Sequence, residues 1–509
     1  MSELRLRAAR PGSGIRRTLA EVRLAGGDGR PLDVVLEDGL VADLRPAGTG
    51  PVEGEVTDAA GRWILPGLWD FHVHFTQWAQ TSRRFDLSGT RTAAEVLAAV
   101  DSHTAPTSDA PTGPDEPAVG FGFRNALWPD AADLAAFDRV SHGRAAILIA
   151  ADLHCVWLNS AALWRYGHSD SATGILREED AFAVLQSIDS APESVVDGWV
   201  RDAADAASAR GVVGIVDFEM AWNLESWSRR IAAGAIALRT RFGIYPQHLD
   251  RAIEERLRSG QILPHTHGLL EVGSLKVITD GSLNTRTAYC VDEYPGLAAT
   301  EHPRGVLNVP PGELVSLMSR ARDAGLESAI HAIGDQANTH VLDAFAATGA
   351  RGSVEHAQLL SADDIARFAA LGVTASVQPE HAMDDRDVAE RYWAGRTDRA
   401  FTLRSILDAG GTLALGSDAP VAPLDPWLAI SAAVARSRDG RAPWHPEQSI
   451  SVAEAIAAST RDGSTTVRAG QVADLVLVDR DPYAATADEL RRMPVSATIL
   501  NGRDTFTSL

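Results

Sequence analysis

The sequence is almost without lysine, because its 47 basic residues include a single lysine, Lys276, and are otherwise arginine. Acidic residues outnumber the basic ones, 68 to 47, which gives a formal net charge of −21. Nucleic acids and anionic membranes are bound by basic surfaces, so this balance argues against both as partners. Arginine stays protonated in proteins, whereas a lysine amine can be deprotonated and modified. The lone lysine therefore raises the question of what an arginine could not do at that position.

Cysteine and long apolar runs are also scarce. The two cysteines, Cys155 and Cys290, form neither a disulfide framework nor a paired-cysteine metal motif. The longest purely apolar run, 145–151, is far shorter than the roughly 20 residues that span a bilayer. The first thirty residues contain no apolar segment of the kind that directs export. We therefore expect a cytoplasmic globular protein that is not embedded in a membrane.

Short apolar runs alternate with helix-compatible stretches through the middle of the chain. This alternation is typical of βαβ units in an α/β fold. Eight runs are present, the number that closes a (β/α)8 TIM-like barrel. They are 64–71, 212–218, 237–244, 274–279, 327–331, 353–356, 373–378 and 412–417. The gap between the first and second runs is too long for a simple crossover, which predicts an inserted α/β subdomain.

Both ends of the chain carry β-like runs broken by Gly, Pro and Asp. Asp33–Glu37 is one near the start, and Ala473–Asp479 and Val495–Asn501 are two near the end. Chain termini often lie close together in a folded protein. We therefore predict that residues 1–62 and 465–509 form one composite β-sandwich domain, and that the barrel spans residues 63–464.

Residues that bind metals stand at the ends of several predicted strands, where barrel enzymes place their reactive groups. The first run ends in His72-Val-His74, whose i, i+2 spacing turns both imidazoles to one face of a strand. His331, His356 and Asp418 end three later runs. Singly, each histidine could be structural and Asp418 could be a helix N-cap. Together at one barrel mouth, they predict a metal site.

Lys276 lies in the fourth run, within the apolar segment 275–278. A free ammonium group would be repelled by a divalent cation, so a lysine in this cluster must be neutral or modified. A neutral amine reacts with carbon dioxide to give a carbamate, whose two oxygens can bridge two metal ions. The alternative is a surface or salt-bridging lysine, although an unpaired charge within an apolar run is costly.

At this point the sequence resembles the amidohydrolase superfamily of metal-dependent hydrolases over nearly its whole length. The segments that carry the resemblance are 65–74, 273–282, 331–335, 355–356, 416–420 and 473–478. They look like the type-3 branch, which includes enzymes similar to N-substituted formamide deformylase. The resemblance implies that the insertion covers about residues 80–205.

The resemblance also implies roles for the matching residues. His72 and His74 would bind the more buried of one or two divalent ions together with Asp418, and His331 and His356 the more exposed ion. An N6-carboxylated Lys276, formed with carbon dioxide, would bridge the two. Asp418 would take a proton from metal-bound water as hydroxide attacks the substrate carbonyl, and pass it to the leaving amine. Zinc is the first choice for these borderline to hard ligands, with iron, manganese or nickel open.

Substrate-binding candidates come from the insertion and from the remaining strand ends. They are Trp78, Arg124, Trp128, His154, Arg286, Gln378 and His381. The insertion departs from the family, because Gly122-Phe-Arg-Asn125 replaces a frequent Gly-Trp-Asp motif, and Leu153 and Cys155 flank His154 in place of smaller or polar residues. Arg124 could bind an acidic group of the substrate, whereas tryptophan is usually a core residue.

These observations favour an amidohydrolase that cleaves a non-peptide C–N bond in a linear amide, such as an N-acyl or N-formyl amine. Ester or lactone hydrolysis would use the same hydroxide. A non-catalytic metal-binding scaffold is a third interpretation, but such a protein should lack ligands, and none is missing here. We expect a small-molecule substrate, no nucleic-acid or membrane partner, and an assembly compatible with a homodimer.

Overall fold

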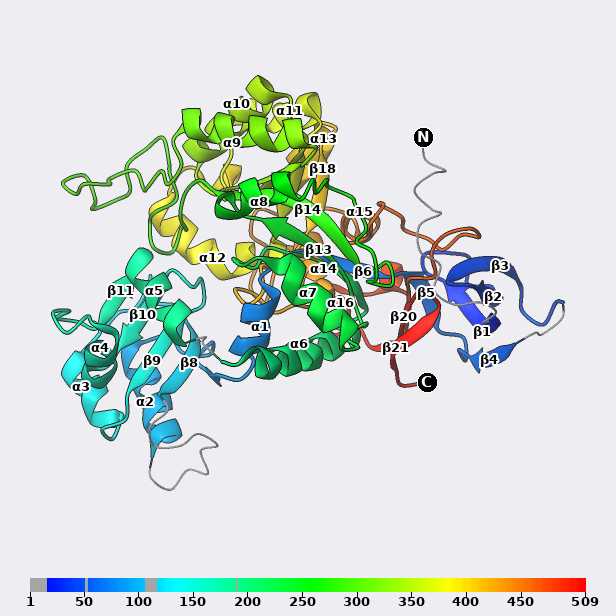
Figure 1. The fold of residues 1–509 in the computed structure, drawn as a ribbon, viewed down its shortest axis with the longest axis horizontal. Coiled ribbons are helices and arrows are strands. Elements are labelled where there is room, and N and C mark those ends of the chain that lie inside the picture. Colours follow the sequence, from blue (N-terminus) through cyan, green and yellow to red (C-terminus); the bar gives the residue numbers. More distant parts are fainter. Residues whose placement is uncertain (1–15, 51–53, 106–116, 189–190) are drawn as a thin grey trace.

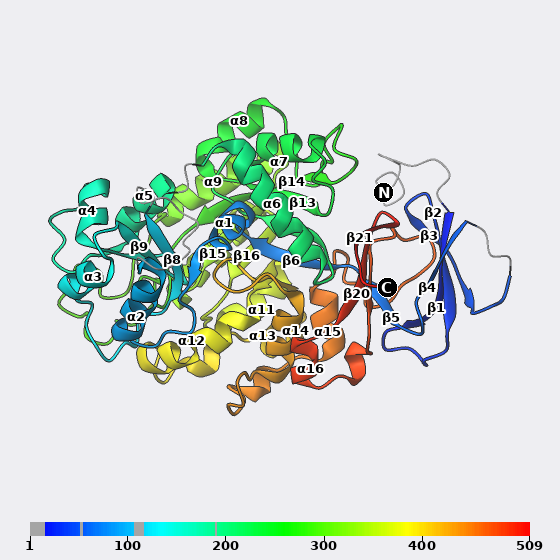
Figure 2. The same cartoon turned by 90° about the horizontal axis from the view of Figure 1, so that it is seen from below.

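The computed structural model describes residues 16–50, 54–105, 117–188 and 191–509. The first fifteen residues of the predicted N-terminal segment lie outside the described residues. Three sheets organise the described chain. In Figure 1 a small terminal sheet lies on the right, the barrel lies in the middle, and the insertion lies on the left. The view from below in Figure 2 gives the same order.

The central sheet contains eight parallel strands in the order β18-β17-β16-β15-β14-β13-β12-β6. Its strands are β6 (Leu68–Val73), β12 (Val212–Asp217), β13 (Arg239–Ile244), β14 (Leu270–Ile278), β15 (Ser328–Ala332), β16 (Gly352–His356), β17 (Thr374–Val377) and β18 (Thr412–Leu415). These strands are nearly continuous buried runs, as expected of a parallel sheet covered by helices. The predicted α/β barrel is therefore confirmed.

The barrel closes between its first and last strands just beyond the end of β18. The backbone N–H of Asp418 donates to the carbonyl of His72 at 2.7 Å, and that of His74 donates to the carbonyl of Ala419 at 2.8 Å. Val73 and Ala419 form a parallel bridge at the same point. The two ends of the sheet thus meet at the residues of the HxH motif.

The first predicted run, 64–71, was expected to be one barrel strand, and this expectation was wrong. The structure divides it into β5 (Trp63–Pro66), which belongs to the terminal sheet, and β6 of the barrel. Gly67 separates them, and a Cβ atom at this position would lie 2.5 Å from both methyl groups of Val213. Only glycine leaves room for the chain to pass from one sheet to the other here.

Helices cover the barrel and connect its strands. They are α1 (Phe75–Thr81), α6 (Glu193–Ser208), α7 (Asn223–Ala232), α8 (Leu249–Glu254), α9 (Pro311–Ala324), α10 (Asp335–Thr348), α11 (Ala362–Leu371), α12 (Pro379–Tyr392), α13 (Leu403–Asp408), α14 (Pro426–Ala435), α15 (Val452–Ala458) and α16 (Ala487–Arg491). Within the described ranges, no helix combines the length and apolar composition needed to cross a bilayer.

The insertion lies between α1 and α6 and has its own five-stranded sheet, in the order β11-β10-β9-β8-β7. Its elements are β7 (Phe85–Asp86), α2 (Ala93–Thr104), β8 (Ala118–Phe123), α3 (Leu134–Val140), β9 (Ala146–Ala150), β10 (Cys155–Leu158), α4 (Ser160–Tyr166), β11 (Ile175–Arg177) and α5 (Glu179–Ile188). Two apolar clusters, separate from the barrel core, stabilise it.

The terminal sheet joins the two ends of the chain. Its strands are β1 (Arg16–Leu24), β2 (Leu32–Glu37), β3 (Leu40–Pro46), β4 (Glu55–Asp58), β5, β19 (Leu475–Val478), β20 (Val495–Leu500) and β21 (Arg503–Thr507). β1 pairs with β2 and β5, and β5 pairs in turn with β19, so β5 joins the N-terminal strands to the C-terminal strands. A shared apolar cluster includes Leu19 and Val34 from one half and Leu475 and Ile499 from the other.

Candidate metal centre

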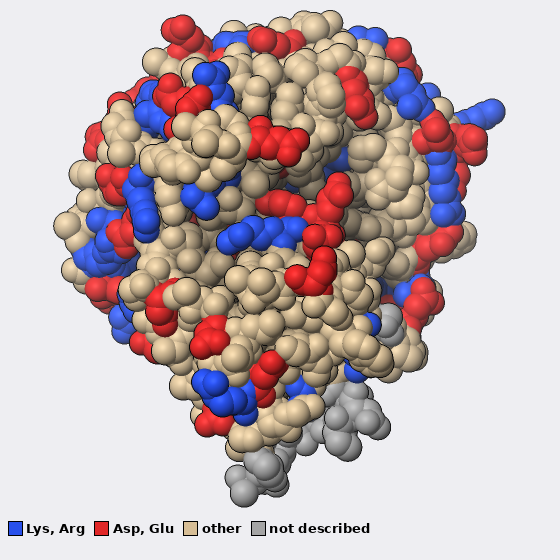
Figure 3. All heavy atoms as spheres, turned by 90° about the vertical axis from the view of Figure 1, so that its left-hand side faces the viewer, with Lys and Arg blue, Asp and Glu red and all other residues tan. Residues whose placement is uncertain are grey.

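The residues predicted to bind metal come together at the carboxyl ends of the barrel strands. His72 lies in β6, Lys276 in β14, and His331 in β15, while Asp418 follows β18. All six predicted ligands line one cavity of about 810 Å³ between the barrel mouth and the insertion; they are His72, His74, Lys276, His331, His356 and Asp418. Figure 3 shows one face of the molecule, on which acidic and basic side chains gather around a central hollow.

Short distances join these side chains. His72 Nε2 lies 3.3 Å from Lys276 Nζ and 3.5 Å from Asp418 Oδ1, and His74 Nε2 lies 3.4 Å from the same Asp418 oxygen. His72, His356 and Asp418 each offer one potential ligand atom, and these three atoms lie within 4.8 Å of one another. The His331 and His356 rings are 4.4 Å apart between centroids. Imidazole and carboxylate at this spacing form a donor set suited to a divalent ion.

The electrostatics of three of the four proposed histidine ligands fit a metal. Burial lowers the pKa of His72 and His356 well below the ordinary value, and burial together with the Lys276 charge lowers that of His331 to about 3. These imidazoles are therefore neutral, which is the form that binds metals. Within the described part of the chain, the buried His356 Nδ1 and His331 Nε2 meet no hydrogen-bond partner. A bound cation could supply a partner for a ring nitrogen of this kind.

Asp418 occupies the middle of the cluster. Its φ of +57° is left-handed, a conformation that non-glycine residues rarely adopt. Burial would raise the pKa of Asp418, but the hydrogen bond and charge of His74, with further charges from His381 and Lys276, hold it below the ordinary value. The same contact raises the pKa of His74 against the opposing effect of burial. The carboxylate is therefore charged and available to bind a cation or accept a proton.

Lys276 is buried to 1% exposure, as its apolar run predicts. Its Nζ lies over the Phe218 ring, 4.3 Å from the centroid. Burial lowers the pKa of this amine to about 8, although the carboxylates of Glu355 and Asp418 oppose the shift. A sizeable neutral fraction of the amine therefore exists near neutral pH.

Glu355 was not assigned a role from the sequence, yet it orients His72. Its Oε2 accepts a hydrogen bond of 2.6 Å from His72 Nδ1, which leaves the Nε2 lone pair facing Lys276 and Asp418. Such carboxylate–histidine pairs fix the tautomer and orientation of metal ligands. The available signal was a charged residue inside a buried strand, where an unpaired carboxylate would be costly.

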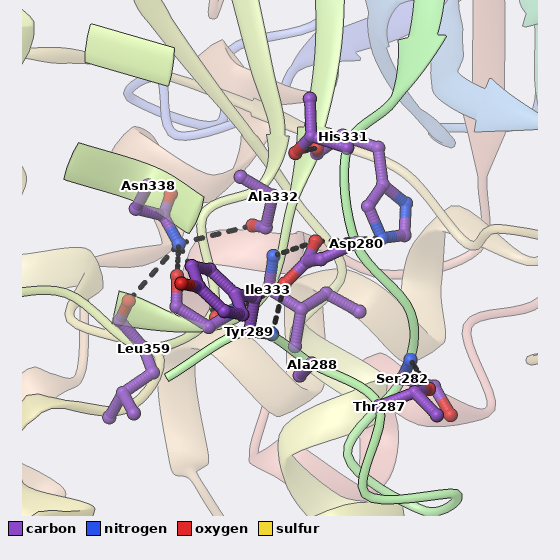
Figure 4. Close-up of polar contacts among 12 residues, drawn as sticks. Asp280, Ser282, Thr287, Ala288, Tyr289, His331, Ala332, Ile333, Asn338 and Leu359 are labelled. Carbon is purple, nitrogen blue, oxygen red and sulfur yellow. Dashed lines mark hydrogen bonds and ion pairs between the residues drawn. The ribbon is translucent and has the colours of Figure 1, made fainter. Parts of the chain in front are cut away.

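Asp280 is a second buried carboxylate without a predicted role (Figure 4). Its oxygens accept backbone N–H groups of Tyr289, Ile333 and Gly334 at 2.9, 3.1 and 2.9 Å. Its Oδ1 lies 3.4 Å from His331 Nε2. Burial raises the pKa of Asp280 to about 7. The residue joins the loop after β14 to the end of β15 beside a proposed ligand.

The predicted substrate-binding residues divide into those that line one of two cavities and those that lie elsewhere. Arg124, His154 and His381 line the cavity, and His381 Nε2 lies 4.0 Å from Asp418 Oδ2. Trp78 lines an adjoining cavity of about 1,040 Å³ that shares Arg124 with the first. Arg124 pairs with Asp384 at 2.9 Å, so its charge is already compensated.

Three further candidates are not among the described residues that line either cavity. Trp128 packs, partly buried, against Phe123 and Trp157 in an apolar cluster of the insertion. The Arg286 guanidinium lies over the Tyr392 ring, 5.3 Å from its centroid. Gln378 is only 2% exposed. The sequence pattern placed these residues near strand ends but could not show which way their side chains point.

Comparisons with known proteins find similarity over almost the whole chain. The sequence profile described as "Amidohydrolase family" matches residues 55–506. The chain is 28% identical to Protein LONG AFTER FAR-RED 3 of Arabidopsis thaliana, covering 92% of this chain and 85% of that protein. It is 27% identical to N-substituted formamide deformylase of Arthrobacter pascens, covering 89% and 90%.

A solved structure shares the fold at lower sequence identity. It is an uncharacterized metal-dependent hydrolase of Pyrococcus horikoshii, which superimposes with a TM-score of 0.76 at 22% identity and covers 93% of this chain and 99% of that one.

Proposed function

The chain belongs to the amidohydrolase family, and from this premise we propose that it hydrolyses a non-peptide C–N bond in a linear amide. An N-acyl or N-formyl amine is the proposed substrate class. One observation carries the proposal: four histidines, three of them buried, converge with an aspartate and a lysine on one cavity at the barrel mouth. The formamide deformylase relative, similar over most of both chains, supports an amide over other substrates.

We propose that His72, His74 and Asp418 hold one divalent ion and that His331 and His356 hold a second. Zinc suits this nitrogen and oxygen donor set. A divalent ion at this position would lower the pKa of a coordinated water toward about 7 and polarise the substrate carbonyl. Glu355 keeps the His72 imidazole turned so that Nε2 faces the other ligands.

Lys276 is proposed to be carboxylated. The neutral amine nitrogen forms a bond to the carbon of carbon dioxide and releases a proton, which leaves a carbamate with two oxygens. The buried position and the pKa of about 8 support this reaction, because both favour the neutral amine. Carboxylation replaces the positively charged ammonium of Lys276 with a negatively charged carbamate beside the histidines. A free ammonium at this position would oppose metal binding.

Asp418 is proposed to move the proton. Its carboxylate is charged and lies within 4.0 Å of three imidazoles, including that of His381. It can accept a proton from the attacking water and deliver it to the nitrogen of the leaving amine. A cavity of about 810 Å³ suits a small-molecule substrate. We also propose a cytoplasmic location, supported by two buried free cysteines.

The proposal is tested by metal analysis together with a substrate panel. Protein purified with zinc should carry at least one equivalent and should hydrolyse members of a panel of N-formyl, N-acetyl and N-acyl-amino-acid amides. A chelator should abolish this activity, and zinc should restore it. Protein with well under one equivalent of metal and no chelator-sensitive activity would refute the proposal. Turnover of matched esters or lactones alone would instead identify an esterase.

A further inference from the structure

His154 belongs to the insertion and lines the cavity of the proposed metal ligands. It lies in the loop between β9 and β10, immediately before Cys155, which pairs with Arg177 of β11. The antiparallel register therefore brings His154 beside Glu178, the residue after β11, and the Glu178 N–H donates to the His154 carbonyl at 3.0 Å. Both residues line the cavity that holds the proposed metal ligands.

Two side-chain contacts fix the His154 ring. Nδ1 lies 2.9 Å from Glu178 Oε2, and the ring packs edge-on against Phe182 of α5. Burial would favour the neutral acid, but the bond from His154 lowers the pKa of Glu178, so its carboxylate can only accept. Nδ1 must therefore be the donor in this pair, and Nε2 is the ring nitrogen that the pair does not use.

Backbone strain is concentrated at this pair. Leu153, directly before His154, has φ +64°, and Glu178 has φ +48°. Non-glycine residues in the left-handed region are uncommon, and they cluster at active sites and ligand clamps. The insertion holds two such residues beside one imidazole, within the wall of the cavity.

The charge of His154 reaches the metal centre. Although burial opposes it, Glu178 raises the pKa of His154 to about 9, with further contributions from Asp152 and Asp418. The imidazolium in turn contributes to lowering the pKa of His331, after the larger effects of burial and Lys276. A cationic N–H donor thus lines the same cavity as the proposed metal ligands.

Other residues fasten the insertion to the barrel at this place. Asp152 accepts hydrogen bonds from Ser282 Oγ at 3.2 Å and Asn284 Nδ2 at 2.8 Å, and Glu178 Oε1 accepts one from Thr287 Oγ1 at 3.0 Å. These contacts join the insertion to the loop after β14 without using His154 Nε2.

We propose that His154 is a catalytic residue supplied by the insertion, whose Nε2–H binds the substrate's carbonyl oxygen as that oxygen becomes negatively charged. The inference rests on the proposed hydrolysis at the metal centre. His154 keeps its proton throughout, and Glu178 positions the ring and stabilises its charge. The insertion therefore supplies a catalytic residue as well as part of the cavity lining.

Two isosteric variants of the zinc-loaded enzyme test the proposal. His154→Asn keeps an amide near Nδ1 for Glu178 but has no group at Nε2, whereas His154→Gln can carry an amide N–H near Nε2. We expect kcat of His154→Asn to fall by about 10²- to 10³-fold, as when an oxyanion donor is removed, and His154→Gln to recover part of this loss. Zinc content and thermal stability should match wild type in both. A wild-type kcat in His154→Asn would overturn the proposal.

The pH profile gives a readout that a structural role would not move. In wild type, kcat should decline as the pH rises through about 9, because the imidazolium then loses its proton. The titratable groups that interact with the charge of His154 are Glu178, Asp152, Asp418, Asp280 and His331. Glu178→Gln keeps an acceptor but removes the main carboxylate, so the decline should begin at lower pH. An unchanged profile in Glu178→Gln would count against the proposed donor.

Binding of methylphosphonate, a tetrahedral anion, separates this proposal from the proposed function. Titration calorimetry with zinc-loaded protein should show roughly ten- to a hundredfold weaker binding to His154→Asn than to wild type, the worth of a charged hydrogen bond. If wild type hydrolyses no amide but this difference is found, the amide assignment fails and the role of His154 stands. Equal affinities would overturn the role of His154 even if amides are hydrolysed.

Discussion

At the scale of the residue, Asp418 and His356 share an uncommon backbone conformation. Their φ values are +57° and +71°, in the left-handed region. Each therefore departs from the direction of its strand at the point where its side chain enters the cavity. Strain of this kind persists only where the surroundings overdetermine it, and it is typical of active sites.

Replacement of Asp418 by asparagine tests the proposed proton transfer. Asparagine has the same shape and tolerates the left-handed conformation, so the fold should remain intact. It cannot accept a proton, and kcat should fall by at least about 10³-fold. Steady-state kinetics, with circular dichroism to verify the fold, provide the measurement. Substantial remaining turnover would remove Asp418 from the proton-transfer role.

Lys276→Arg tests the proposed carbamate. The variant retains the positive charge of a free lysine but cannot react with carbon dioxide, so most bound metal and activity should be lost. Metal analysis and kinetics measure both. Lys276→Ala supplied with a short-chain carboxylate is the matched control, because the added anion could replace the bridge and restore part of the activity. An active arginine variant would disprove the carbamate.

Glu355→Gln tests the orientation of His72. The variant keeps an oxygen acceptor but loses the carboxylate charge, and zinc affinity should weaken by about 10- to 100-fold. Competition with a chromogenic chelator measures the affinity. The same substitution at the exposed Glu301 serves as control and should leave it unchanged. Equal affinities in the two variants would show that the 2.6 Å contact has no influence on the metal.

Sequence reasoning identified the side chains that converge on the cavity, but not the carboxylates behind them. The spacing of an HxH pair and the ends of apolar runs are local signals. The contact between His72 and Glu355 joins residues 283 positions apart, and no local pattern reports it. For the same reason, the direction of the Trp128 and Gln378 side chains became known only from the fold.

At the scale of the element, all eight barrel runs were located from apolar periodicity and spacing. The run that merged two strands was at the start, where β5 and β6 follow each other almost without interruption, and the fourth run began four residues later than β14. β5 and β6 read as one apolar run because both are buried, although in different sheets. Apolar periodicity reports burial and cannot report which sheet provides it.

Gly67→Ala tests this junction. The added Cβ would lie 2.5 Å from the methyl groups of Val213, so overpacking should destabilise the protein by about 1–3 kcal/mol. The control is Gly198→Ala in α6, where a Cβ would meet nothing within 4 Å and the better helix propensity of alanine should stabilise slightly. Thermal unfolding measures both. A Gly67→Ala protein as stable as wild type would contradict the proposed crowding.

At the scale of the whole molecule, metal binding and stability should be linked. The proposed ligands come together only in the folded protein. A metal ion that binds only the folded state stabilises that state by about 2.7 kcal/mol when the free metal concentration is one hundred times the Kd. We expect chelation to lower the apparent Tm and zinc to restore it. Magnesium, which prefers oxygen ligands, is the control and should have little effect. An apparent Tm independent of zinc would argue against a metal at this centre.

The barrel closes at the proposed metal ligands themselves, since the Asp418 N–H bonds to the His72 carbonyl. An ion held by both side chains would therefore act as a cross-link between the first and last strands of the ring. Such a cross-link closes a loop of almost the entire barrel sequence, and loops of that length lose the most chain entropy when they are closed. Substitutions in the helices between these strands would not touch this cross-link. The sequence of the outer helices could therefore change while the barrel stays closed.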